Sequence, residues 1–133
     1  MATFNLEIIT PLEVVFKGEA EFVKLRTVVG DMGILAKHAP LVSELVLGQM
    51  MVRNDDKVEE NYFISGGFLE ISKEKTIILA DAAMNVKDID VVKAKKEVEE
   101  LKAKKGKIQE EKDLVQVEKS LQESLMKIQL GQR

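Results

Sequence analysis

The side chains that most often perform acid–base or nucleophilic chemistry are scarce in this chain. His38 is the single histidine and there is no cysteine, so one chain can form neither a multi-histidine nor a thiolate metal site. As a general base, His38 would need a neighbouring nucleophile and a carboxylate to orient its ring. Ser43 and Ser65 lack the flanking residues that mark a nucleophilic serine. We therefore expect no catalytic residue, and we interpret His38 as a polar turn residue.

Three other segments have a composition that could bind phosphate or nucleic acid. Gly30-Asp31-Met32-Gly33 is similar to the clamp loop of some RNA-binding domains, but its acid would repel phosphate, so a plain turn is expected. Ser65-Gly66-Gly67 has the glycines of a phosphate-cradling loop without a Walker lysine, and strand-like residues flank it, which favours a hairpin turn. The basic run at 102–107 has no interleaved aromatic residue and indicates a solvated helix end.

The overall composition narrows the class of protein further. The 133 residues are 45% apolar and 32% charged, which is typical of one globular domain or two small ones. The formal net charge of -3 argues against nucleic acid as the main partner. The first residues lack the pattern of a signal peptide, and no apolar run approaches the length of a membrane span. These features predict a soluble intracellular protein.

The composition changes part-way along the chain. All six aromatic residues and both prolines lie within the first 68 positions. The first 84 residues carry 8 basic and 13 acidic side chains, whereas the remainder carries 12 basic and 10 acidic ones. The shift predicts a domain boundary near 84/85, with one domain at 1–84 and another at 85–133.

The first domain has the pattern of short β-strands. Phe4, Leu6 and Ile8 alternate with polar residues, and further strand-like runs follow at 14–16, 22–29, 41–47, 49–53, 61–65, 68–72 and 76–80, separated by turn residues. This pattern predicts an antiparallel β-sandwich or flattened barrel. Some runs are apolar on both faces, as at 77–80, and such strands need cover from another element.

The second domain has the pattern of two amphipathic helices. Asp88 or Asp90 can cap the first helix and Gly106 can end it. The apolar stripe of the first helix is Val91, Ala94, Val98 and Leu101, and that of the second is Leu114, Val117, Leu121, Leu125 and Ile128. Outward charges pair at i,i+4 as Lys93/Glu97, Lys95/Glu99 and Lys96/Glu100. These helices predict an antiparallel two-helix hairpin.

A hairpin with one apolar stripe per helix is marginally stable by itself. The conformational entropy lost on ordering its backbone opposes the modest free energy gained by burying the stripes. It can fold on its twin helix, on the sandwich or on a partner protein. Such an element suits a two-position switch. A permanently docked hairpin remains an alternative.

Three motifs in these two domains resemble those of one known family. The run VVGDMGILAKHAPLV at 28–42 resembles the G-x-x-G-I…HAPL signature of the epsilon subunit of F-type ATP synthases. SGGFLE at 65–70 and LADAA at 79–83 are similar to two further family segments. The resemblance covers the whole chain and implies a ten-stranded sandwich, a C-terminal helical pair, and a non-catalytic place in the central stalk of the rotor, which serves ATP synthesis driven by an ion gradient.

The resemblance also implies partners. The sandwich would bind the gamma subunit and rest on the ring of c subunits, with the loop of Asp31 facing the ring and the neighbourhood of His38 lying near gamma. The hairpin, when extended, would reach the alpha and beta subunits and inhibit ATP hydrolysis. The basic residues of the second helix are few, namely Lys112, Lys119, Lys127 and Arg133, so we expect weak inhibition. The protein would lie peripherally on the cytoplasmic face of the cell membrane, without inserting into it.

Some members of this family bind ATP through an I/L-D-x-x-R-A motif. This chain has Ile89, Asp90 and Ala94 at matching positions, but Lys93 replaces the arginine. Lysine lacks the bidentate fork that suits phosphate. Glu100 and Glu123 lie where the resemblance implies further arginines, and acids there repel a polyphosphate. We expect no cofactor, and at most weak ATP binding.

Two hypotheses from other classes remain open at this point. One is a free-standing interaction module, in which a β-sandwich adaptor carries a helical docking arm. The other is an enzyme whose site has no recognisable motif.

Overall fold

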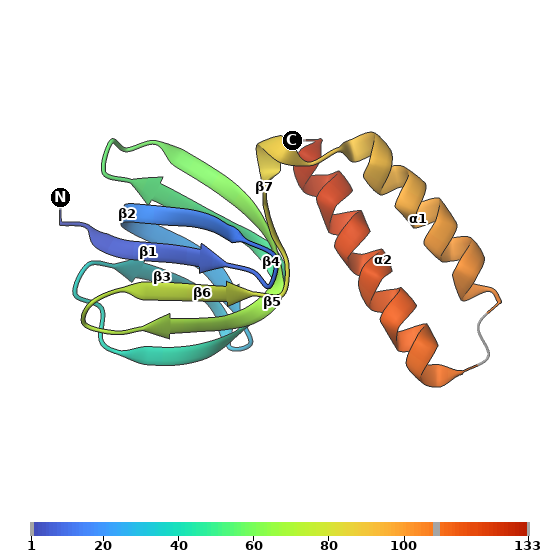
Figure 1. Cartoon of the computed structure of the whole chain (residues 1–133), viewed down its shortest axis with the longest axis horizontal. Coiled ribbons are helices and arrows are strands. Elements are labelled where there is room, and N and C mark those ends of the chain that lie inside the picture. The colour runs from blue at the N-terminus through green and yellow to red at the C-terminus, as the bar shows by residue number, and fades with distance from the viewer. Residues whose placement is uncertain (1, 108–109, 133) are drawn as a thin grey trace. The chain divides into compact units, whose positions relative to one another are not determined.

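The strand-like runs of the first part of the chain form seven strands, β1 to β7, as Figure 1 shows. Their bounds are β1 Phe4–Ile9, β2 Val14–Thr27, β3 Gly30–Leu35, β4 Leu41–Asn54, β5 Glu59–Ile71, β6 Thr76–Ala80 and β7 Ala83–Asn85. This computed structural model describes residues 2–107 and 110–132 and divides the chain into two units, Met1–Asn85 and Val86–Arg133.

The strands of the first unit close into a flattened barrel. The pairing order is β1-β6-β5-β4-β2-β3, and an additional pairing of β1 with β2 joins the two sides. All pairs are antiparallel except β1 with β6, which run parallel. The predicted antiparallel sandwich is therefore confirmed, with one parallel pair where the first strand of the chain meets the sixth.

Three strands are long enough to serve both layers of the sandwich. In one layer, the second half of β2 pairs with β3 and β4, while the first half of β5 pairs with β4 and β7. In the other layer, β1 pairs with the first half of β2 and with β6, and the second half of β5 pairs with β6 and the start of β4. Because β2, β4 and β5 each count twice, seven strands supply the ten segments of a ten-stranded sandwich.

Two expected turns are strand residues instead. Gly66 and Gly67 lie inside the continuous strand β5 with φ of 115° and 129°, values that L side chains rarely adopt. A Cβ on Gly67 would overlap the Leu79 carbonyl oxygen and lie 2.8 Å from the Ala80 Cα. The two glycines therefore bend β5 against β6, and no hairpin turn occurs at 65–67. Gly30 likewise begins β3, because the actual turn lies immediately before it, at Val28 and Val29.

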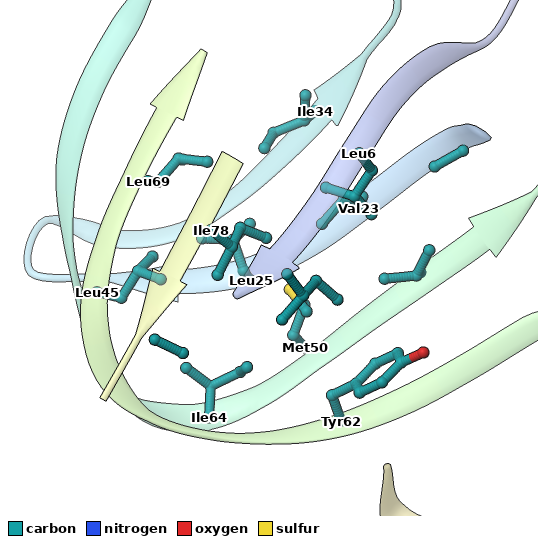
Figure 2. Close-up of a cluster of buried hydrophobic side chains, with 14 of the residues drawn as sticks. Leu6, Val23, Leu25, Ile34, Leu45, Met50, Tyr62, Ile64, Leu69 and Ile78 are labelled. Carbon is teal, nitrogen blue, oxygen red and sulfur yellow. The ribbon is translucent and has the colours of Figure 1, made fainter. Parts of the chain in front are cut away.

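The core of the first unit lies between the two layers. Its side chains come from β1 to β6. Figure 2 shows several of them, among them Leu6, Met50 and Ile78, pointing into the space between the strands. The large fully buried aliphatic residues include Leu6, Ile8, Val23, Ile34, Met50, Val52, Leu69 and Ile78. Burying each of these side chains stabilises the fold by roughly 1.5–3 kcal/mol. The first domain therefore has its own core, as the alternation of residues predicts.

A buried carboxylate fixes the β4–β5 turn. Glu21 is 2% exposed, and it accepts hydrogen bonds of 3.2 and 3.0 Å from the Lys57 ammonium. Lys57 occupies the turn with a φ of 64°, which is unfavourable for a lysine. Arg53 lies 4.0 Å from Glu21 and stacks over the Phe22 ring at 5.4 Å. A buried charge needs such partners, so these contacts hold the turn against β2.

The second unit contains a short 3-10 helix, η1 Val86–Asp88, and the helices α1 Val91–Lys105 and α2 Glu111–Gly131. The two long helices form the predicted antiparallel hairpin (Figure 1). Asp90 caps α1 by accepting a 3.0 Å hydrogen bond from the Lys93 backbone N–H, and Gly106 follows its last turn. Residues 108–109 of the connection, and Arg133, lie outside the described residues.

The seam between the helices differs from the expected stripe at one position. Leu125 is 41% exposed, whereas Ser124 is buried. Each residue turns a helix by about 100°, so two successive steps of four move Leu125 roughly 80° away from the Val117 direction. A step of four followed by one of three returns to the seam at Ser124.

The expected i,i+4 ion pairs of α1 are also absent from the part of the chain that the structure describes. Glu97 instead accepts a 3.3 Å hydrogen bond from the Ser124 hydroxyl. Lys105 pairs with Glu118 of α2 at 3.2 Å. These two polar contacts of α1 thus join it to α2.

Replacing Gly67 by alanine should destabilise the sandwich strongly. The added Cβ would overlap the β6 backbone, and the residue would keep an unfavourable φ, so we expect a loss of about 3 kcal/mol or more in the free energy of unfolding. Gly48→Ala is the matched control, because its Cβ would make ordinary contacts of 3.4 Å or more with Arg26 and Val46. Urea unfolding of the two variants measures the difference. Equal stability would contradict the bend described here.

Candidate functional site

The β2–β3 tip, defined as Thr27, Val28, Val29 and Gly30, presents two apolar side chains to solvent. Val28 is 53% exposed and Val29 is 89% exposed. The Thr27 hydroxyl donates to the Gly30 carbonyl at 2.9 Å and accepts from the Val29 N–H at 3.2 Å. The Val28 N–H also donates to the Glu44 carbonyl of β4 at 3.1 Å. These bonds hold the tip in one conformation, which lowers the entropy lost on docking.

Asp31, predicted to contact a partner, lies directly beside the β2–β3 tip. It is opposite Arg26 in the ladder, and the Arg26 Nε donates to its Oδ1 at 3.1 Å. Both side chains are more than half exposed, so the pair adds little stability. The pair does neutralise the charge beside the valines. The sequence interpretation singled out Asp31 and missed Val28 and Val29, whose signal was a pair of valines where turn residues are usual.

His38, the second predicted contact residue, lies in a cleft at the other end of β3. The cleft has a volume of about 580 Å³, and its walls are the start of β1, the 35–40 segment and the β5–β6 turn. The His38 Nδ1 lies 2.8 Å from the Ala39 carbonyl oxygen, a geometry that suits an Nδ1–H donor. Ser72, also in this wall, donates to the Lys75 carbonyl. Neither side chain bonds to the other, so the cleft holds no Ser–His pair.

A further surface lies on the outer side of one layer. We define the β4–β5–β6 face as Val42, Glu44, Phe68, Glu70 and Leu79, all of which are exposed. In the ladders, Phe68 is opposite both Glu44 and Leu79, and Val42 is opposite Glu70. The sequence pattern indicated that strands such as β6 need cover on two faces. The structure of this unit leaves the outer face uncovered.

The four residues of the ATP-like motif begin α1. Asp90 is engaged as the helix cap, and Ala94 is buried. Ile89 lies close to the last turn of α2, since a Cβ on Gly131 would be 3.1 Å from its Cγ2. Lys93 is exposed. Three of the four residues therefore have structural roles that need no nucleotide.

A groove between α1 and α2 is the space that a nucleotide would need. Its volume is about 390 Å³, and its charged lining is Glu97, Glu100, Glu123, Lys104 and Lys127. Phosphate is usually bound by arginine forks, lysines and free backbone N–H groups. With three carboxylates and two lysines, this lining does not fit a polyphosphate. Over residues 2–107 and 110–132, no cluster of three acidic or histidine side chains is placed to hold a metal ion.

A comparison with family models identifies the family of the first unit. The model described as the ATP synthase delta/epsilon chain beta-sandwich domain matches residues 3–86. The chain is also 53% identical over 133 residues to the sodium ion specific ATP synthase epsilon chain of Propionigenium modestum, covering 100% of this chain and 96% of that one. It is 37% identical over 131 residues to the ATP synthase epsilon chain of Shouchella clausii, covering 98% and 96% of the two chains.

Solved structures have the same fold. A chain in the cryo-EM structure of the mitochondrial ATP synthase of Euglena gracilis, with OSCP, F1 and c-ring, matches with a TM-score of 0.79 at 27% identity. The match covers 100% of this chain and 83% of that chain. A chain in the central stalk and c-ring structure of Tetrahymena thermophila matches with a TM-score of 0.56 at 14% identity, covering 66% and 70%, and supports the fold alone.

Asp90→Ala should destabilise the hairpin, because the Lys93 N–H then loses its acceptor. We expect the free energy of unfolding of the helices to fall by about 1 kcal/mol. Asp88→Ala is the matched control, an acid two residues earlier that caps no helix. Thermal melting followed at 222 nm measures both variants. A loss of the same size in Asp88→Ala would show that charge near the helix start, and not the cap, is responsible.

Proposed function

This chain belongs to the epsilon-chain family of the F-type ATP synthase, and from that premise we propose that its sandwich joins the gamma subunit to the c-ring while its hairpin restrains ATP hydrolysis. Membership makes the chain a non-catalytic subunit of the rotor, in the central stalk. It favours the rotor subunit over the free-standing adaptor and over the enzyme that the sequence left open.

The β2–β3 tip carries the proposal for the c-ring contact. Two rigidly held valines beside a neutralised Arg26–Asp31 pair form a small apolar surface with a polar rim. Such a surface suits the polar loops of a membrane protein better than lipid, because its charged groups would lose water on insertion. In this proposal Val28 and Val29 make the contact, and Asp31 holds Arg26 beside them.

The gamma subunit is proposed to cover the β4–β5–β6 face and the adjoining segment of His38. Exposed apolar side chains on a sheet mark a surface that a partner buries. Phe68 and Leu79 supply the apolar centre, and Glu44 and Glu70 supply acceptors for basic partner residues. His38 lies shortly before β4 in the chain, so the same partner can reach both.

The hairpin is proposed to act as a brake that depends on an extended form. In that form its helices would rise along gamma to the alpha and beta subunits and block rotation. Over its described residues, helix α2 contains few basic residues, namely Lys112, Lys119 and Lys127. Contacts to acidic surfaces would therefore be few, and the brake weak.

The proposed location is the cytoplasmic face of the cell membrane, where the subunit is held by its partners. No helix over the described ranges has the length and apolar character of a membrane span. The attachment proposed here is to gamma and the c-ring.

Val29→Asp should weaken the coupling between the head and the ring. A charge at the most exposed part of the tip has to be buried on docking, so we expect ion-driven ATP synthesis to fall several-fold, with the free energy of unfolding changed by less than about 0.5 kcal/mol. Val58→Asp is the matched control, an exposed valine in the β4–β5 turn at the other end of that layer. Synthesis is measured in membrane vesicles with each variant fully incorporated. Unchanged synthesis with Val29→Asp would contradict the proposed contact.

Deleting residues 86–133 should leave a folded sandwich that still assembles. The first unit has its own core and every aromatic residue. Near-UV circular dichroism of the truncated chain checks folding, and pull-down with alpha, beta and gamma subunits checks assembly. Removing a weak brake should raise the ATPase rate of the complex about fivefold at most, which corresponds to roughly 1 kcal/mol. An identical rate with and without the hairpin would refute the regulatory role while leaving the place in the stalk intact.

A further inference from the structure

We propose that the α1–α2 hairpin is self-latched: contacts between its own helices hold it closed, and no nucleotide takes part. The importance of this latch for regulation rests on the proposed function, but the latch itself is a property of the isolated chain. Three contacts form it, one near each end of the helices and one between them.

The first contact is a close approach where α2 ends and α1 begins, opposite the loop that connects the helices. Gly131 ends α2, and a Cβ there would lie 2.6 Å from the Val91 Cγ2 and 3.1 Å from the Ile89 Cγ2. Glycine is common where a helix ends, but at this position the close approach also excludes a larger side chain. The absence of a side chain lets α2 press directly on the start of α1. Leu130, which precedes it, is buried.

The second contact is a polar bond inside the seam. Ser124 is 4% exposed, and its hydroxyl donates to the Glu97 Oε2 at 3.3 Å. A leucine in place of Ser124 would add apolar burial. The serine instead makes part of the stability of the closed hairpin depend on a directional bond, which a competing partner can replace. The third contact is the Lys105–Glu118 ion pair near the far end, at 3.2 Å.

The same groove leaves no suitable place for ATP. Its volume of about 390 Å³ falls within the usual range for ligand pockets, so size does not exclude a nucleotide. The charges of the lining exclude it, because three carboxylates outnumber two lysines there. The carboxylates are those of Glu97, Glu100 and Glu123. The chain has three arginines, Arg26, Arg53 and Arg133, and none of them is in α1 or α2. The N–H group of Lys93 at the start of α1 is already bonded to Asp90.

Nucleotide therefore has no differential affinity for the closed hairpin, and a ligand without differential affinity shifts no equilibrium. Opening is then governed by competition between the latch and partner surfaces. ATP binding in this groove therefore does not decide whether the hairpin is closed or open.

The test uses the full chain, which has no native cysteine to interfere with labelling. Spin labels on V92C and Q129C, both exposed positions on the two helices, report the interhelical distance by pulsed electron resonance. We expect a narrow distance distribution that millimolar Mg·ATP leaves unchanged, and no heat of ATP binding by calorimetry. Gly131→Leu should broaden the distribution or lengthen the distance. Gly106→Ala is the matched control, since its Cβ would meet only the Ala103 oxygen at 3.7 Å.

Ser124→Ala tests the latch with a smaller change, and we expect a partial broadening of the distribution. Far-UV circular dichroism separates opening, in which helicity persists, from unfolding of the helices. Saturable ATP binding, or a distance that ATP alters, would overturn the proposal. So would a Gly131→Leu chain with an unchanged distance. None of these readouts uses the assembled enzyme, so failure of the brake hypothesis would be recognised separately by an unchanged ATPase rate.

Discussion

The close approach of Gly67 to the β6 backbone is the constraint on which the sandwich depends. Because Gly66 and Gly67 both have positive φ, β5 bends there and contributes to two layers without interruption. Residues 62–67 are buried in succession, and the alternation of buried and exposed side chains resumes only at Phe68. The bend therefore does more than shape the core. It also turns Phe68 outward, beside Leu79, and so creates the centre of the β4–β5–β6 face.

The two units solve the problem of stability in different ways. The sandwich buries a cluster of aliphatic side chains from six strands, and its deeply buried carboxylate, Glu21, is hydrogen-bonded to Lys57 of the turn that it holds. The hairpin buries fewer side chains and uses Ser124, a polar residue, in the middle of its seam. A seam of this kind gives up some hydrophobic stabilisation for a directional hydrogen bond. That division of properties suits a rigid connector joined to an element that changes partners.

The sequence predicted the class of the fold well because its strongest signals are local. Alternation identified the strand residues, and the motifs at 28–42 and 65–70 identified the family. Asp88 and Asp90 were the two candidate caps for the start of α1, and the structure uses Asp90. The failures were non-local. Gly66 and Gly67 have the composition of a turn. Only the neighbouring backbone of Leu79, which is distant in the sequence, shows that they form a bend within a strand. Leu125 fits a stripe by spacing, but the partner helix faces Ser124. The exposed valines of the tip could not be recognised as a surface until the position of the turn was known.

The closed ring of strands has a mechanical consequence. Since β1 pairs with both β2 and β6, the path β1-β6-β5-β4-β2 returns to its start without a free seam. Twisting such a ring about its axis shears every ladder at once, whereas an open sheet can yield at a single edge. A body of this kind is torsionally stiff. In a rotating shaft it would pass torque between the two ends with little lag, and the elastic compliance that smooths the steps of the motor would have to come from other parts of the shaft.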